Sequence, residues 1–342
     1  MKLGFALPHI GPIASKDNIR TAAQQAEAMG YQTLWTNERV LVPLNPKTPY
    51  PGAADGKLNP EYEIMFEHLT VLTYAAAFTS TIRLGVSVIN IPFYNPVMLG
   101  RRIATMDQLS DGRVTLGVGL AWSEDECDVN NVPFRERGRI GEEAIQALLA
   151  VWGPDPVEYH GKYFTIEPSM IGPKPVQKPH PPLLVGAFMP KALDRAGRLA
   201  DGFTGCCAPV DALIGMMNAV KDAARQRGRD ADSLQYVMRC LVTRTDEPVE
   251  GPNRPVAVGT WEQIQEDVRK MAEAGVDEAF FDVAFQPDVK DFSSYMRYME
   301  RFSTIAESAV AVCPDGARLA RGMHAAQCAR LGWMGGPGWQ TR

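Results

Sequence analysis

The sequence predicts a closed (β/α)8 TIM barrel, and three observations lead to that fold class. Short apolar runs alternate with segments of helical periodicity, the alternation gives eight strand–helix units, and 342 residues are enough for one such barrel. A doubly wound parallel sheet is the alternative for this pattern.

The first four units occupy the N-terminal half of the chain. Strands are expected at 2–7, 31–37, 82–90 and 113–119, and helices at 15–30, 66–79, 95–110 and 135–152. Two insertions interrupt this order: a long Pro- and Gly-rich loop at 40–62 after the second strand, and a hairpin at 157–167 after the fourth helix, with its turn at His160-Gly161. We expect the long loop to form a wall or lid over the substrate, a disordered crossing being the alternative.

The last four units repeat the alternation. Strands are expected at 181–188, 201–206, 234–245 and 276–284, and helices at 190–200, 209–228, 259–275 and 291–302. Thr260 and Gln263 form a predicted capping box. Residues 1–302 therefore form the barrel, and residues 303–342 are interpreted as a C-terminal extension or tail.

Composition narrows the functional class. The net charge is −5 and there is no dense Lys/Arg stripe, which argues against nucleic acid as a partner. Six cysteines without a Cys-x-x-Cys pair, and no apolar run of membrane-spanning length, favour a cytoplasmic protein with no membrane segment. The five histidines are dispersed, so no metal site is expected, and the acidic run Glu124, Asp125, Glu126 and Asp128 is interpreted as a solvated loop.

The stretch "GRVTLGVGLAWSEDE" contains Gly117-x-Gly119, which raises the possibility of a dinucleotide-binding turn. That turn needs a third glycine and opens directly into a helix, whereas Trp122 occupies the third position and an acidic loop follows. Gly117 and Gly119 are instead expected at the carboxyl end of a barrel strand, where glycine lets a flat ligand approach the backbone.

Six segments in order resemble the luciferase-like monooxygenase superfamily: "AEAMGYQTLWTNERVLVP", "IRLGVSVINIPFYNP", "DGRVTLGVGLAW", "YHGKYF", "RAGRLADGF" and "GTWEQIQEDVRKMAEAGVDE". Within it, "GVSVINIPFYNP" is similar to the branch that uses coenzyme F420, a 5-deazaflavin. The resemblance implies hydride transfer between the deazaflavin and a small organic substrate, and a homodimer. An FMN-dependent monooxygenase supplied by a partner reductase, and a non-catalytic flavin-binding barrel, are the alternatives.

The resemblance also implies where the cofactor is held. A non-prolyl cis peptide at Ser87-Val88 would form a bulge against the ring, and Asn90 after it would donate a hydrogen bond to the ring edge. The turn Gly186, Ala187 and Phe188 would bind phosphate with its backbone and the following helix N-terminus, although family members often have a second glycine where Phe188 stands.

Candidate catalytic residues follow the first two strands. Related proteins commonly carry Asp-His where this chain has Glu38-Arg39, and arginine stays protonated, so it cannot act as a base. Arg39 would hold an anionic substrate or the charge of the reduced ring, while Glu38 is either the base or the ion-pair partner of Arg39. His9 is a candidate for contacting the substrate. Trp35 and Trp122 are expected at the mouth, where they either wall the ring or pack the rim.

Overall fold

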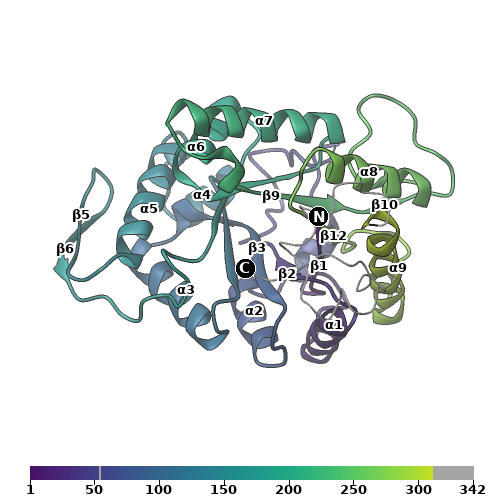
Figure 1. Ribbon diagram of the computed structural model, residues 1–342, viewed down its shortest axis with the longest axis horizontal. Coiled ribbons are helices and arrows are strands. Elements are labelled where there is room, and N and C mark those ends of the chain that lie inside the picture. The colour runs from purple at the N-terminus through teal and green to yellow at the C-terminus, as the bar shows by residue number, and fades with distance from the viewer. Residues whose placement is uncertain (54, 311–342) are drawn as a thin grey trace, which may run out of the picture.

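Eight parallel strands close into a barrel in the order β1-β12-β9-β8-β7-β4-β3-β2, which confirms the predicted fold class (Figure 1). The computed structural model describes residues 1–53 and 55–310. The barrel strands are β1 (Lys2–Ala6), β2 (Thr33–Thr36), β3 (Arg83–Asn90), β4 (Val114–Gly119), β7 (Leu183–Gly186), β8 (Gly202–Cys206), β9 (Gln235–Leu241) and β12 (Glu278–Asp282).

Helices cover the outside of the barrel, as parallel strands buried on both faces require. They are α1 (Lys16–Ala28), α2 (His68–Ala76), α3 (Pro96–Leu109), α5 (Arg137–Trp152), α6 (Pro190–Leu199), α7 (Val210–Gln226), α8 (Trp261–Glu273) and α9 (Phe292–Val310). The short helix α4 (Glu124–Val129) instead contacts the loop after β2, and three 3-10 turns are η1 (Pro60–Glu63), η2 (Ile91–Phe93) and η3 (Ala231–Ser233). The capping box of Thr260 and Gln263 at the start of α8 is present as predicted.

Several boundaries differ from those predicted. The hairpin consists of β5 (Val157–His160) and β6 (Thr165–Ser169), so His160 still belongs to a strand and the turn lies at 161–164. The strand predicted at 234–245 divides into β9 and β10 (Thr243–Arg244), which pairs with β11 (Val258–Gly259). Helix α9 continues past 302 because Phe302 and Ile305 extend its buried face, and the rest of the predicted tail, 311–342, lies outside the described residues.

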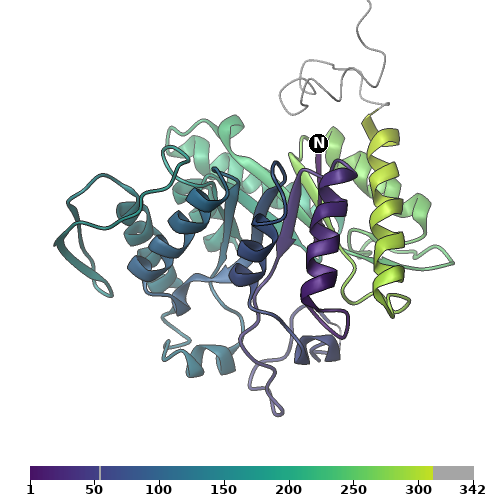
Figure 2. The same ribbon diagram turned by 90° about the horizontal axis from the view of Figure 1, so that it is seen from below.

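The two ends of the barrel are built differently. In Figure 2 the N-terminus lies at the upper edge, and the long insertion projects at the lower edge, where the strands end. The insertion is attached to α4 by two hydrogen bonds from a backbone N–H to a side-chain oxygen: Lys47 N–H donates to Asp125 Oδ2 at 2.9 Å, and Glu124 N–H donates to Thr48 Oγ1 at 3.1 Å. The loop therefore packs against α4 at this end of the barrel, and its role as a wall or lid over a substrate stays a prediction.

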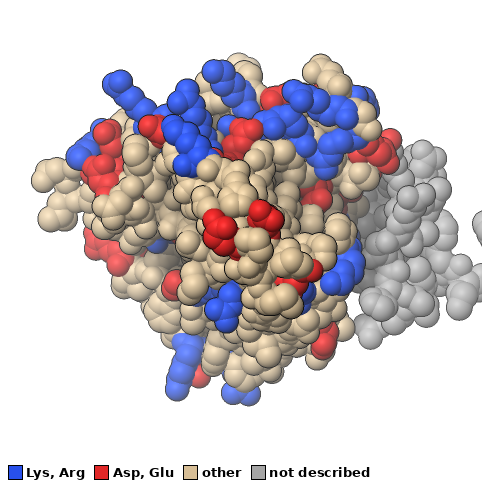
Figure 3. All heavy atoms as spheres, turned by 90° about the vertical axis from the view of Figure 1, so that its left-hand side faces the viewer, with Lys and Arg blue, Asp and Glu red and all other residues tan. Residues whose placement is uncertain are grey.

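The surface carries charges of both signs. Figure 3 shows the face of the β5–β6 hairpin, where basic side chains gather along the upper edge, acidic ones lie among and below them, and a broad area carries neither. Within residues 1–53 and 55–310, no helix is both long enough and apolar enough to cross a membrane.

Candidate functional site

Strand β3 bulges two residues before its end. The Ser87-Val88 peptide bond is cis, as predicted, and the pairing of β3 with β4 shifts register between Val86 and Ile89. Ser87 Oγ lies 3.1 Å from Thr204 Oγ1 on β8 and forms a hydrogen bond with it. The bulge is therefore held from across the barrel at the level of the strand ends.

Three glycines make room for this bulge. A Cβ added at Gly119 would lie 2.7 Å from Val88 Cγ2, and one added at Gly186 would lie 3.0 Å from Val88 Cγ1. At Gly117 an added Cβ would lie 2.3 Å from the carbonyl oxygen of Val86. Gly117 and Gly119 were expected to let a flat ligand approach the backbone, but it is strand β3 that lies close to them. Contact between these glycines and a cofactor stays a prediction.

Glu38 lies at the bulge. Its Oε2 accepts a hydrogen bond of 2.6 Å from the N–H of Asn90, and its Oε1 accepts one from the Tyr94 hydroxyl. Burial raises the pKa of Glu38 to about 7, with a further increase from the charge of Glu126, while the two hydrogen bonds act in the opposite direction. A carboxyl group with this pKa takes up and releases a proton near neutral pH.

Arg39 pairs with Glu126 rather than with Glu38. Its Nε lies 3.3 Å from Glu126 Oε1, and the two side chains are only 6% and 0% exposed. The same carboxylate oxygen accepts a 2.8 Å hydrogen bond from the N–H of Val40. The expectation of a solvated acidic loop is wrong for Glu126, because α4 turns this side chain inward, and Glu38 is not the partner of Arg39.

Two atoms of this ion pair are left without partners. Among the described residues, neither Arg39 Nη1 nor Glu126 Oε2 has a hydrogen-bond partner, although both atoms are buried. A buried polar atom normally has a partner, so an unpaired donor here is a place for a ligand atom.

An aromatic cluster surrounds Arg39. The guanidinium lies 4.6 Å from the ring centroid of Trp122 and 5.6 Å from that of Tyr62. Tyr50 of the insertion packs against both rings, and Tyr62 in turn contacts Phe285 after β12. Trp122 therefore lies at the mouth as predicted, beneath the insertion.

His9 is tied to the backbone. Its Nδ1 lies 2.8 Å from the Leu7 carbonyl oxygen, and its Nε2 lies 3.2 Å from the Asn37 carbonyl oxygen and 3.3 Å from the Asn37 backbone nitrogen. Burial lowers the pKa of the ring, while the contacts with the Leu7 and Asn37 backbone and the charge of Asp282 act in the opposite direction. Both ring nitrogens thus hold the loops after β1 and β2, and contact of His9 with substrate stays a prediction.

An ion pair at the ends of β9 and β12 was missed by sequence reasoning. Arg239 donates to Asp282 Oδ2 through Nε at 3.1 Å and through Nη2 at 2.5 Å, and Nη2 also reaches Asn37 Oδ1 at 3.3 Å. In the register of β9 and β12, Arg239 lies opposite Phe280 and Asp282 lies opposite Leu241, so the two side chains meet diagonally and only the register of the barrel brings them together.

Two adjacent cysteines lie beside this pair. Cys206 and Cys207 are half-buried free thiols at the end of β8. A hydrogen bond from Cys206 lowers the pKa of Cys207 to about 7 against the effect of burial, with a further contribution from the charge of Arg239. The adjacent cysteines were visible in the sequence, but their environment was not.

Trp35 does not lie at the mouth, and that prediction is wrong. It is 1% exposed, stacks on Phe280 at 4.7 Å between ring centroids, and donates a 2.7 Å hydrogen bond from Nε1 to Glu278 Oε1. Its ring occupies the space left by Gly4 and Gly85 on the neighbouring strands. The side chain therefore points into the barrel, toward the end where the strands begin.

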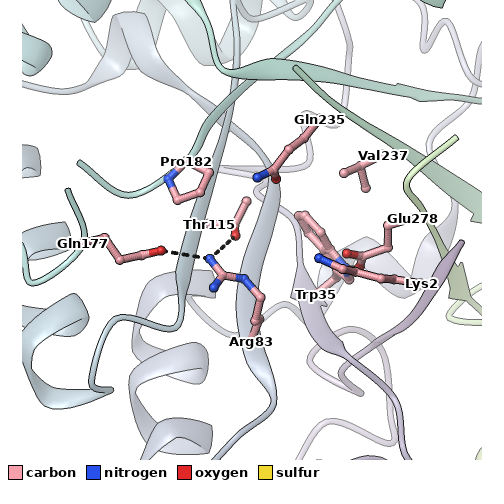
Figure 4. Close-up of a pocket in the computed structure, with 9 residues that line it drawn as sticks. All are labelled: Lys2, Trp35, Arg83, Thr115, Gln177, Pro182, Gln235, Val237 and Glu278. Atoms are coloured by element: carbon pink, nitrogen blue, oxygen red, sulfur yellow. Dashed lines mark hydrogen bonds between the residues drawn. The ribbon is translucent and has the colours of Figure 1, made fainter. Parts of the chain in front are cut away.

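A cavity of about 200 Å³ opens at that end (Figure 4). Arg83 crosses it and donates from Nη2 to Thr115 Oγ1 at 3.1 Å and to Gln177 Oε1 at 3.1 Å. The other lining side chains come from Lys2, Trp35, Pro182, Gln235, Val237 and Glu278. None of these is a predicted site residue except Trp35.

The predicted phosphate turn leads into an uncapped helix. No side chain caps the N-terminus of α6, where Met189 is the N-cap residue and Pro190 follows. Ala187 is buried, whereas Phe188 is 51% exposed. Pro190 has no N–H and the N–H of Ala192 donates to the Met189 carbonyl oxygen at 2.8 Å, so the first turn offers an anion the N–H and the ammonium group of Lys191. Among the described residues, no cluster of three or more His, Cys, Asp or Glu is placed to hold a metal ion.

Comparison with known proteins yields a family and a fold. The model of the luciferase-like monooxygenase family matches residues 3–250. An uncharacterized protein of Mycobacterium tuberculosis is 34% identical over 211 residues, which make up 61% of this chain and 74% of that protein. The FMNH2-dependent dimethylsulfone monooxygenase of Pseudomonas putida is 28% identical over 166 residues, 47% of this chain and 46% of that protein.

Solved structures share the barrel. An F420-dependent secondary alcohol dehydrogenase in complex with an F420-acetone adduct superimposes with a TM-score of 0.70, covering 89% of this chain and 97% of that one. Its sequence is 18% identical, so this likeness concerns the fold.

Proposed function

This chain belongs to the luciferase-like monooxygenase family, and within it we propose an oxidoreductase that transfers a hydride between coenzyme F420 and an alcohol or carbonyl substrate. The observation that carries the proposal is the carboxyl group of Glu38, buried at the β3 bulge with a pKa of about 7. Interconversion of an alcohol and a carbonyl compound moves a proton as well as a hydride. Glu38 is suited to give and take that proton.

The residues present fit a cofactor with an anionic arm. The N–H of Lys191 in the uncapped first turn of α6, together with Gly186 and Ala187, would bind its phosphate. Val88 and Asn90 at the bulge would lie against its ring, and Lys191 adds a positive charge near the phosphate. When bound, the deazaflavin supplies the carbon that accepts or donates the hydride.

Arg39 is proposed to hold the substrate. Its buried Nη1 offers a hydrogen-bond donor, and its pairing with Glu126 fixes the direction of the guanidinium. Such a donor binds the oxygen of an alcohol or carbonyl group and orients it. The aromatic rings around it exclude water from this contact, which strengthens the hydrogen bond.

A flavin-dependent monooxygenase is the second candidate. The FMNH2-dependent relative from Pseudomonas putida favours it, since its 28% identity is accompanied by a named flavin requirement. In that case reduced FMN would come from a partner reductase. A reductase for either cofactor and a second copy of this chain are the partners that we propose.

Binding of the purified protein to coenzyme F420 and to FMN, each oxidised and reduced, tests the proposal and can be followed by fluorescence. Tight binding of the deazaflavin alone supports it. Preference for reduced FMN turns it into the monooxygenase, and binding of neither removes the cofactor assignment.

A matched pair of variants tests the phosphate turn. Lys191→Glu places a negative charge in the first turn of α6 and should weaken binding of F420 about 3- to 30-fold. Lys270→Glu makes the same charge change in the last turn of α8, at the other end of the barrel, and should leave binding unchanged. Equal weakening in both would show a general charge effect and no phosphate site.

A further inference from the structure

We propose that four side chains form a proton path between the β3 bulge and solvent at the start of α2: Glu38, Tyr94, His68 and Glu67. The inference rests on the proposed function only in giving Glu38 its role in the reaction. The path itself is argued from contacts of this chain.

The inner half of the path lies under the insertion and against β3. The Tyr94 hydroxyl donates to Glu38 Oε1, and its oxygen lies 3.5 Å from His68 Nε2. Glu38 Oε1 itself lies 3.8 Å from the same nitrogen. Tyr94 thus stands between the carboxyl group and the imidazole.

The outer half leads to the surface of the barrel. His68 Nδ1 lies 3.6 Å from Glu67 Oε1, the side chain of the residue that caps α2. The exposed fraction is 4% for the His68 side chain and 44% for that of Glu67, so the path passes from the interior to water within one residue. Arg102 holds the outer carboxylate through a 2.7 Å contact from Nη2 to Oε2.

His68 is suited to relay a proton because it is neutral at neutral pH. Burial lowers its pKa to about 4, with His9 and Arg102 lowering it further and Glu67 opposing them. A neutral imidazole has one N–H and one free nitrogen, so it can receive a proton on one side and release one on the other. At the inner end of the path, the negative charge of Glu126 raises the pKa of Glu38.

The transfer balances without any co-reactant. A proton from solvent passes by way of Glu67 to Nδ1 of His68, the Nε2 proton moves to the Tyr94 oxygen, and the Tyr94 hydroxyl proton moves to the Glu38 carboxylate. Three O–H or N–H bonds form as three break, and no electron changes place. The reverse order releases a proton from Glu38, and a tautomer exchange of the imidazole resets the path.

His9 shows what a histidine outside such a path looks like. Its two nitrogens contact the backbone of Leu7 and Asn37, and neither group passes a proton on. His68 instead has a hydroxyl on one side and a carboxylate on the other. The two buried histidines therefore differ in whether their partners can exchange protons.

Hydrogen–deuterium exchange at the Glu38 carboxyl group tests the path in the protein without cofactor. At a pH below its pKa of about 7 the protonated group gives an infrared carbonyl band, identified by its loss in Glu38→Gln. After rapid transfer to deuterated buffer the band shifts, and the rate of the shift is measured. Tyr94→Phe and His68→Phe should each slow it at least about tenfold.

The matched control is Tyr74→Phe, which removes a hydroxyl from α2 but leaves the path intact, since the Tyr74 ring packs on Phe78. It should exchange at the wild-type rate. Glu67→Gln tests the outer end on an exposed residue that retains a capping oxygen, and it should also slow the shift, even if a buried variant does not fold. Wild-type rates in Tyr94→Phe or Glu67→Gln would overturn the path.

This experiment separates the path from the proposed function. Exchange is observed with no cofactor or substrate present, so failure to bind F420 leaves the result standing. Conversely, equal exchange rates would remove the path while leaving the cofactor assignment and the role of Glu38 to their own tests.

Discussion

Both ends of the barrel contain a buried carboxyl group whose pKa is raised by burial, but the groups that hydrogen-bond to the two carboxyl groups differ in kind. At the end where the strands begin, Glu278 accepts hydrogen bonds from Trp35 Nε1 at 2.7 Å and from Thr33 Oγ1 at 3.1 Å. At the mouth, Glu38 accepts from Tyr94, which leads on to His68. A raised pKa alone therefore does not identify a reactive site.

Unpaired atoms distinguish the two ends more sharply. In the described part of the chain, four buried side-chain atoms lack a hydrogen-bond partner, and all four belong to segments that follow the carboxyl ends of strands: Arg39 Nη1, Glu61 Oε2, Glu126 Oε2 and Arg244 Nε. None belongs to a residue that lines the opposite cavity. The mouth leaves polar atoms for a ligand, and the other end uses its polar atoms to hold the barrel together.

The largest effect should come from removing the two carboxyl groups in turn. Glu38→Gln should lower the turnover number about 10²- to 10⁴-fold, because the substitution removes a general acid–base group. Glu278→Gln should stay within about threefold of wild type, since an amide can still accept from Trp35. Stopped-flow measurement of hydride transfer compares them, and a similar loss in both would erase the distinction between the ends.

The second comparison concerns stability and uses the two tryptophans. Trp35→Ala should lower the free energy of unfolding by about 3–5 kcal/mol, because it empties a fully buried site in the barrel. Trp122→Ala at the mouth, where the ring is half-buried under the insertion, should lower the free energy of unfolding by less than half as much. Urea unfolding measures both, and a larger loss at Trp122 would make the mouth the more tightly packed end.

A third comparison uses the two arginines. Arg39→Lys keeps the charge beside Glu126 but loses the Nη1 donor, so KM for the substrate should rise about 10- to 100-fold. Arg83→Lys at the opposite end should leave KM unchanged, because Nη2 of that side chain already donates to Val114, Thr115 and Gln177. An unchanged KM in Arg39→Lys would contradict substrate binding by the unpaired nitrogen.

The smallest effect is a pH dependence of stability. In the folded protein the pKa of Glu38 is raised from 4.5 to about 7, so the folded state binds this proton more tightly than the unfolded state does. The resulting stabilisation is fully present below about pH 4.5 and is lost as the pH rises through about 7. Glu38→Gln should reduce this fall in the free energy of unfolding by about 1–3 kcal/mol.

The control for the pH series is Glu278→Gln, whose carboxyl pKa is raised in the same direction. Each variant should reduce part of the dependence of the unfolding free energy on pH, and the double variant Glu38→Gln/Glu278→Gln should reduce both parts. Identical profiles for wild type and Glu38→Gln would contradict the raised pKa of Glu38.

The barrel could be predicted because each strand and helix carries its own periodicity. The Ser87-Val88 bulge was also predicted, although from resemblance to a family and not from the spacing of residues. The orientation of Trp35 could not be predicted, since the depth of a strand residue in the barrel depends on the stagger of its neighbours. Gly4 and Gly85, which leave room for its ring, are informative only once that stagger is known.

The partners of the charged residues could not be predicted from the sequence either. Glu38 and Arg39 are adjacent in sequence, but successive side chains of an extended segment point in opposite directions, and each found a different partner. Arg39 pairs with Glu126, and Glu38 with Tyr94, across distances along the chain that no local pattern spans. Local reasoning placed Glu38 and Arg39 after a strand end and missed the groups that they contact.

The attachment of the insertion to α4 has a consequence for protein engineering. Because Glu126 binds both Arg39 and the backbone of Val40, a substrate loop transplanted from a homologue would leave a buried charge behind unless α4 came with it. Shuffled libraries should therefore exchange residues 39–62 and 123–129 as one cassette. Crossover points between the two segments would produce chimeras that fail for an electrostatic reason, even when every strand of the barrel is intact.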